Sequence, residues 1–121
     1  MTRKRYDNHS TEFGLWLREQ KEIDSKLGYT TSNIDFMWFN YKNKMWMIIE
    51  EKRYGSQIRY AQKQIFNTIN NAINDPNYKG FYILIFENTN PDDGKIWLGK
   101  LNKDMKEIDK IYLLRFLQFK F

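Results

Sequence analysis

Apolar residues recur at regular spacing through the first half of the chain and predict a helix followed by a β-hairpin. Between residues 11 and 26 the apolar side chains fall three and four residues apart, which is the spacing of one face of a helix. Two runs rich in aromatic and β-branched residues follow, 34–41 and 45–52, with a short segment of Lys and Asn between them. Such runs on either side of a polar segment predict two antiparallel strands.

The second half alternates helical and strand-like patterns. Residues 57–74 carry apolar side chains at three- and four-residue intervals and run into an Asp-Pro pair, which predicts a helix that stops there. The apolar run 80–87 is short and nearly continuous, as in a buried central strand, and 96–101 predicts a further strand after a loop rich in Asn, Pro, Asp and Gly. The tail, 109–119, predicts a helix with Asp109 as its N-cap.

The order of these elements, which is helix, hairpin, helix, strand, strand and helix, predicts an α/β fold. A helix between the hairpin and the strand at 80–87 indicates a crossover connection that lays this strand beside the hairpin. The expected architecture is a mixed β-sheet with flanking helices, formed by the whole chain, 1–121, as one domain.

Composition narrows the classes of function. The chain has 121 residues and no cysteine, so disulfides, thiolate nucleophiles and cysteine zinc sites are excluded, and a cytoplasmic location is the expectation. It lacks any run of about 18 apolar residues, so we expect no membrane-spanning segment. The 20 Lys and Arg residues against 15 acidic ones give a net charge of +5, which favours an anionic partner, either nucleic acid or a membrane surface.

One triplet of an acid, any residue and Lys stands out by its position. Several such triplets occur along the chain, but only Glu50-Glu51-Lys52 closes an apolar strand-like run. Residues two apart in a strand project from the same face. Glu50 and Lys52 are therefore expected to point together, and Glu51 to point away.

The register of the hairpin decides whether Asp35 joins these two residues. An even number of loop residues puts Asp35 on the face of Glu50 and Lys52. Pairing Lys42 with Met45 then sets Asp35 directly across from Lys52. An odd number of loop residues puts Asp35 on the opposite face, unless a bulge corrects the register.

Two carboxylates and an ammonium group on one sheet face suit phosphodiester hydrolysis. Asp35 and Glu50 can supply oxygen ligands to Mg²⁺, with waters and a substrate phosphate completing the coordination shell. Mg²⁺ polarises the phosphate and activates a water, and Lys52 can stabilise the negative charge that develops. Alternatively, Asp35 could be a residue at the start of a strand that caps a turn, and Glu50 and Lys52 could form a solvated cross-strand charge ladder.

This arrangement resembles the PD-(D/E)XK nuclease superfamily, which includes restriction endonucleases, Holliday-junction resolvases and RecB-type nucleases. The matching segments are Ile34-Asp35 and Ile48-Ile49-Glu50-Glu51-Lys52, followed by the helix at 57–74 and the strand at 80–87. The resemblance implies a restriction-endonuclease-like αβββαβ core. It also implies a Mg²⁺- or Mn²⁺-dependent endonuclease that cuts DNA as a homodimer, with DNA rather than a membrane as the partner.

The chain departs from the family pattern in two places. Ile34 stands where the family usually has proline, and only residues 28–33 are available for the first strand of the family's meander. A short or missing first strand would change the topology of the sheet from that of the family.

The resemblance implies further site residues. Many members place a glutamate early in the first helix, close to the metal, so Glu12 is expected as a third metal ligand, with Glu19 as the alternative. Some RecB-like members carry a glutamine in the helix after the lysine, and Gln62 or Gln64 could match it.

Cations beside aromatic side chains follow the triplet and could hold the DNA backbone. Arg53, Arg59 and Lys63 are the candidates for this contact. The alternative for these residues is an ordinary solvated surface.

Two other functions stay open. One is a non-catalytic nucleic-acid-binding module on the same fold, and the other is a small phage-type interaction protein whose aromatic residues form an interface. Exposure of Trp38 or Trp46 in a large patch would favour the interaction protein.

Overall fold

The computed structural model describes residues 12–29 and 32–121, and the chain divides into two compact units, Met1–Asn33 and Ile34–Phe121. The second unit holds every strand that the structure describes. The one-domain organisation expected from the length of the chain stays a prediction.

The first unit contains a shorter helix than its sequence predicts. Helix α1 (Glu12–Glu19) is followed by two 3₁₀ turns, Lys21–Ile23 and Ser25–Leu27. The helix ends where Gln20 adopts an extended backbone, and the Asp24 carboxylate accepts a hydrogen bond from the Lys26 N–H at 2.8 Å and caps the second 3₁₀ turn.

The second unit contains one five-stranded sheet whose strands lie in the order of the sequence. The strands are β1 (Phe36–Phe39), β2 (Trp46–Arg53), β3 (Tyr78–Phe86), β4 (Ile96–Lys100) and β5 (Lys106–Ile108). β2 and β3 are parallel, and the other neighbouring pairs are antiparallel. The predicted α/β class with a mixed sheet and flanking helices is therefore confirmed.

Two details of the sheet differ from the sequence patterns. The sequence does not predict β5, whose three residues are too few to show an alternation of apolar and polar positions. In the stretch 28–33, none of the residues that the structure describes belongs to a strand, so no additional strand is seen before β1.

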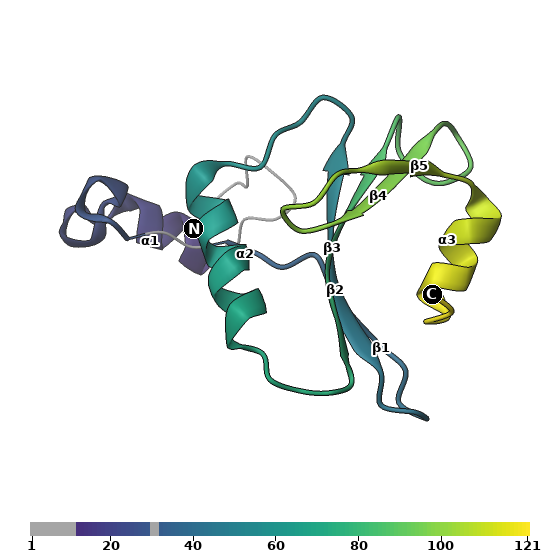
Figure 1. The fold of residues 1–121 in the computed structure, drawn as a ribbon. Coiled ribbons are helices and arrows are strands. Elements are labelled where there is room, and N and C mark those ends of the chain that lie inside the picture. The colour runs from purple at the N-terminus through teal and green to yellow at the C-terminus, as the bar shows by residue number, and fades with distance from the viewer. Residues whose placement is uncertain (1–11, 30–31) are drawn as a thin grey trace. The chain divides into compact units, whose positions relative to one another are not determined.

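Helix α2 (Tyr60–Ala72) forms the crossover between the parallel strands β2 and β3 (Figure 1). It packs on one face of the sheet through Phe66, which is fully buried and lies against Phe81 with the ring centroids 4.8 Å apart. The helix begins later than the predicted residue 57 because Arg59, at its N-cap, has an extended backbone.

Helix α3 (Lys110–Leu117) covers the opposite face of the sheet (Figure 1). Its buried Leu113 and Phe116 belong to a core cluster with Met47 and Tyr82 of the sheet. None of the helices within residues 12–29 and 32–121 has the length and apolar character needed to cross a membrane.

The predicted N-cap of α3 is confirmed and gives a first test of the fold. Asp109 Oδ1 accepts a hydrogen bond from the Tyr112 N–H at 2.7 Å. Replacing Asp109 with Ala leaves that N–H without its partner, so we expect the free energy of unfolding to fall by about 1 kcal/mol. Urea denaturation measures this loss. Asp104→Ala, an exposed acid outside any helix, serves as the control, and an equal effect of the two substitutions would contradict the capping role.

The loop of the β1–β2 hairpin is longer than expected, and the predicted pairing of Lys42 with Met45 is wrong. The Asn40 N–H instead donates to the Met45 carbonyl at 2.9 Å and closes the loop. Within the loop, the Asn40 side chain accepts from the Lys42 N–H, and Lys44 adopts a left-handed backbone with a φ of 67°. The Asn40 side chain thus stabilises a turn that begins nearer to β1 than the sequence predicts.

The observed register fixes the position of Asp35. Phe36 pairs with Ile49, and continuing this register by one residue sets Asp35 across from Glu50 in place of Lys52. The even parity of the register is confirmed, while the partner predicted for Asp35 is wrong. Because Glu50 and Lys52 are two residues apart in β2, the shift leaves all three positions on one face.

Candidate active site

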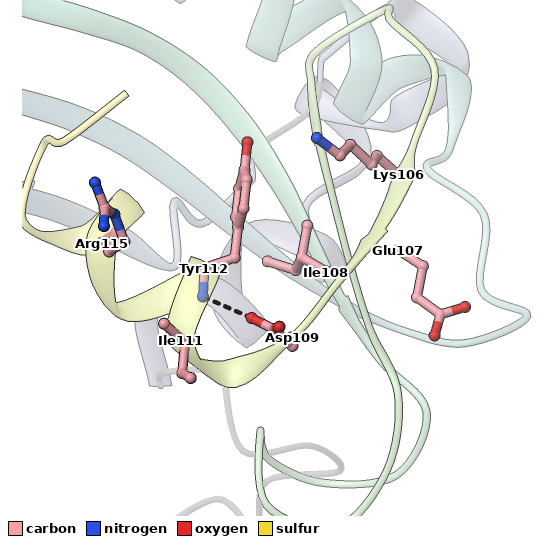
Figure 2. A pocket seen from close by; sticks show the side chains of 7 residues that line it. All are labelled: Lys106, Glu107, Ile108, Asp109, Ile111, Tyr112 and Arg115. Carbon is pink, nitrogen blue, oxygen red and sulfur yellow. Dashed lines mark hydrogen bonds between the residues drawn. The ribbon is translucent and has the colours of Figure 1, made fainter.

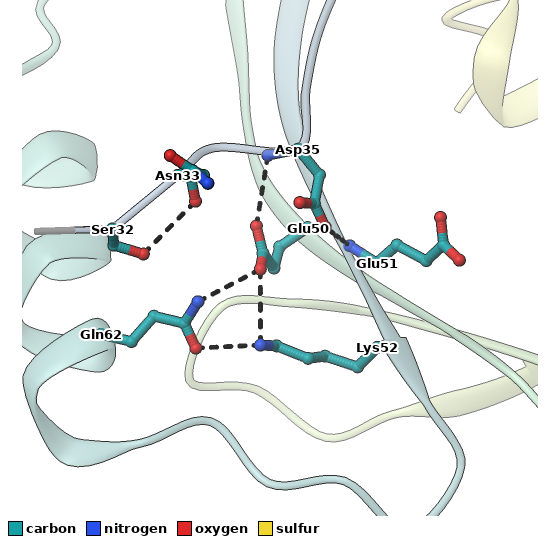
Figure 3. A network of polar contacts seen from close by, with 7 residues as sticks. All are labelled: Ser32, Asn33, Asp35, Glu50, Glu51, Lys52 and Gln62. Carbon is teal, nitrogen blue, oxygen red and sulfur yellow. Dashed lines mark hydrogen bonds and ion pairs between the residues drawn. The ribbon is translucent and has the colours of Figure 1, made fainter. Parts of the chain in front are cut away.

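Three side chains from β2 and the first turn of α2 form one polar network (Figure 3). Lys52 Nζ donates a hydrogen bond to Gln62 Oε1 at 2.9 Å and lies 3.4 Å from Glu50 Oε2. Gln62 Nε2 donates to the same oxygen of Glu50 at 3.3 Å. The glutamine therefore holds the carboxylate and the ammonium group in a fixed arrangement.

Asp35 contacts both acidic residues of the triplet from the strand opposite. Its N–H donates to Glu50 Oε1 at 3.4 Å, and its Oδ2 accepts from the Glu51 N–H at 2.9 Å. In Figure 3 the Glu51 side chain points away from the network, as the alternation of a strand requires. Asp35 Oδ1 accepts no hydrogen bond from the residues that the structure describes, so this oxygen can bind a ligand.

Among the described residues, Glu50 is the one charged residue that is buried, with 3% of its surface exposed. Burial and the nearby Asp35 carboxylate raise the pKa of Glu50, while Lys52 and the Asp35 N–H act in the opposite direction. The positive charge of Lys52 thus offsets only part of the effect of burial and of Asp35 on the pKa of Glu50. A further cation would stabilise the ionised form.

The raised pKa of Glu50 predicts how the stability of the metal-free protein depends on pH. The folded state keeps the Glu50 proton to a higher pH than the unfolded state, in which the pKa has its usual value of 4.5. The contribution of Glu50 to the free energy of unfolding therefore falls as the pH rises from that value through the folded pKa. Glu50→Gln lacks this loss, so we expect the variant to gain stability relative to the original protein as the pH rises above 4.5. Urea denaturation of both proteins in EDTA measures the difference, and a difference that is constant with pH would contradict the expectation.

The pair of carboxylates fits a Mg²⁺ or Mn²⁺ ion. Asp35 raises the pKa of Glu50 by repulsion, and a divalent cation bound by both residues would replace that repulsion with attraction. Residues 12–29 and 32–121 contain no cluster of three or more His, Asp or Glu side chains that could hold a metal. Mg²⁺, however, is often bound by one or two carboxylates plus waters and a substrate phosphate. Bound here, it would polarise a phosphodiester and favour deprotonation of the attacking water.

Lys52 has a free donor that could contact a ligand. The Lys52 side chain is 18% exposed, so it reaches solvent although its ammonium group also contacts Glu50 and Gln62. An ammonium group has three N–H donors, and Gln62 and Glu50 take two of them. The third is available to a phosphate oxygen, where it would stabilise developing negative charge.

The candidate DNA-binding cations do not all lie on the face of the site. Arg59, at the N-cap of α2, and Lys63, in that helix, are exposed beside the element that supplies Gln62. Arg53 ends β2 and, by the alternation of the strand, points to the face opposite Lys52.

Gln62 and Gln64 have different hydrogen-bond partners, and Glu12 and Glu19 both lie in helix α1. Gln62 is in the network, whereas Gln64 donates to the Tyr60 hydroxyl at 2.7 Å within α2. Glu12 and Glu19 begin and end α1 in the first unit. The contacts described above for Asp35, Glu50, Lys52 and Gln62 lie within the second unit.

One partner in the site leaves no signal in the sequence. The Glu51 N–H binds Asp35, and every residue except proline carries a main-chain N–H. Only the hairpin register could have indicated it.

A shallow pocket of about 350 Å³ lies between β5 and α3, away from this network (Figure 2). Its acidic and basic side chains are mixed, and its Asp109 carboxylate is engaged as the cap of α3. The lining residues are Lys106, Glu107, Ile108, Asp109, Ile111, Tyr112 and Arg115. This pocket therefore offers no set of reactive groups comparable to the site on β2.

Comparisons of the chain with protein-family models, with curated proteins and with solved structures find no match. The functional assignment accordingly depends on the geometry of the site.

Proposed function

We propose that this protein is a Mg²⁺-dependent endonuclease that hydrolyses phosphodiester bonds in DNA. The observation that carries the proposal is the network in which buried Glu50 lies between Lys52, Gln62 and Asp35. Asp35 and Glu50 would bind Mg²⁺ or Mn²⁺, and Lys52 would contact the scissile phosphate. Gln62 is a positioning residue, since it acts by holding Glu50 and Lys52.

The surroundings of the network support this proposal. The chain has a hairpin, the α2 crossover and the parallel strand β3, and we propose that these elements belong to a restriction-endonuclease-like core. The net charge of +5 favours binding of a polyanion. A homodimer would bring one site to each strand of a duplex.

Incubation with branched, single-stranded and duplex DNA tests the function. In Mg²⁺ or Mn²⁺ we expect the protein to cut at least one of these substrates, and in EDTA to cut none. Intact DNA in both metals would overturn the proposal. If the protein then still bound DNA, the non-catalytic module on the same fold would account for it.

The outermost strand favours a second candidate, a small interaction protein. All four residues of β1 are exposed, among them Trp38 at 43%, whereas Trp46 packs against the core under α2. An exposed strand with aromatic side chains is typical of a surface that meets another protein. The cleavage assay separates the two candidates, because an interaction protein of this kind would neither cut nor bind DNA.

A further inference from the structure

Two aromatic rings stack beside the candidate active site. Tyr54 follows β2 and Trp97 lies in β4, and their ring centroids are 4.9 Å apart with an interplanar angle of 23°. Tyr54 is 67% exposed, and Trp97 is its one ring partner among the described residues. One face of the tyrosine thus rests on the tryptophan, and the rest of its ring is open to solvent.

The strand registers place this pair on the same face of the sheet as the catalytic candidates. Lys52 pairs with Ile85 across β2 and β3, and Ile85 pairs with Trp97 across β3 and β4. Directly paired residues project from the same face, so Lys52, Ile85 and Trp97 form one row across the sheet. Glu50 lies one step back along this face of β2, and Tyr54 lies one step forward.

The residues at the two ends of this row carry charges of opposite sign. Lys52 stands at one end, and Trp97 pairs on its other side with Glu107 of β5. With a divalent cation held by Asp35 and Glu50, the lysine end is positive and attracts a polyanionic strand, whereas Glu107 at the other end repels it. Its phosphates therefore belong near Lys52, and its bases fall over the aromatic pair.

We propose that the Tyr54–Trp97 pair is a stacking platform for an unpaired base of single-stranded DNA, next to the phosphate held at Lys52. This inference rests on the proposed function and narrows its substrate class to DNA with unpaired nucleotides. Bases in a continuous duplex stack on their neighbours and expose only their edges, whereas an unpaired base can offer its whole face to an aromatic ring. Stacking on an exposed ring also tolerates any base, so the platform contributes affinity without sequence specificity.

Binding in Ca²⁺ tests the platform with little hydrolysis, because this ion takes oxygen ligands but activates a bound water less than Mg²⁺ does. The probes are a fluorescently labelled single-stranded oligodeoxynucleotide, the same strand with abasic residues in place of its nucleotides, and the matching duplex. We expect the protein to bind the single strand more tightly than the abasic strand, which has the same phosphates. Tyr54→Leu should weaken binding of the single strand by about tenfold and leave the abasic strand unchanged, because it removes only the stacking surface. Tyr54→Phe should bind as the original protein does, since it keeps the ring.

Tyr41→Leu is the matched control, because Tyr41 is 71% exposed in the hairpin loop and makes no ring contact with the described residues. Equal binding of the single strand by Tyr54→Leu and the original protein would overturn the platform, as would equal weakening by Tyr54→Leu and Tyr41→Leu. Absence of any binding to the single strand would overturn it as well. In each case the cleavage assay decides the proposed nuclease function separately.

Discussion

Replacing Glu50 with Gln is expected to lower the rate of Mg²⁺-dependent DNA cleavage by about 10³-fold or more, because a metal contributes several kcal/mol to catalysis and about 1.4 kcal/mol corresponds to each tenfold in rate. The amide keeps the shape of the side chain but loses the charge that binds the cation. Isothermal titration with Mn²⁺ should show the matching loss of metal affinity. Cleavage rates under single-turnover conditions measure the effect on the chemical step.

Glu51→Gln is the matched control for this experiment. Glu51 is the neighbouring acid, is exposed, and directs its side chain away from the network. The substitution makes the same change of charge one residue away, so cleavage should change by less than about twofold. Equal losses in the two variants would show that net charge, and not the site, sets the rate. Full activity of Glu50→Gln would remove Glu50 from the mechanism.

Replacing Lys52 with Met is expected to lower the cleavage rate by about 10²- to 10³-fold, because it removes a donor aimed at developing negative charge. Its effect on the metal should have the opposite sign to that of Glu50→Gln. Lys52 lowers the pKa of Glu50 by its positive charge, so its removal leaves the carboxylates more favourable to a cation. We therefore expect Mn²⁺ to bind Lys52→Met at least as tightly as it binds the original protein.

This combination separates a phosphate-binding lysine from one that only supports the fold. A supporting lysine would, on removal, lower stability and metal affinity together. Lys103→Met, an exposed residue in the turn after β4, is the control for the lost charge and should cleave normally. Weaker Mn²⁺ binding by Lys52→Met, with the rate unchanged at saturating metal, would contradict the role given to Lys52.

Strand alternation alone predicts part of the site. Glu50 and Lys52 project together because they are two residues apart at the end of an apolar run, and this needs no long-range information. Asp35 is harder, since its position depends on the hairpin loop. The sequence does not show that Asn40 caps a longer turn, so the parity of the register was predictable and the partner of Asp35 was not.

The remaining contacts depend on packing between distant segments. Gln62 and Gln64 look alike in the sequence, and only the docking of α2 on the sheet decides that Gln62 meets Glu50. The stack of Tyr54 on Trp97 requires three strands in register, and neither residue carries a local pattern that announces it. The helix predicted over 11–26 is too long for a local reason, because the backbone becomes extended at Gln20 and again at Asp24, where the apolar periodicity continues.

The parallel pairing of β2 with β3 has a consequence for how the protein acquires its site. Asp35, Glu50, Lys52 and Gln62 lie close together in the sequence, but β2 is buried only when β3 has aligned beside it after the α2 crossover. Bringing parallel strands together closes a long loop, which is a slow step in folding. The hairpin, by contrast, needs only local contacts. The groups of the candidate site are thus expected to reach their final positions late, at the same time as the hydrophobic core closes around Phe81 and Ile83.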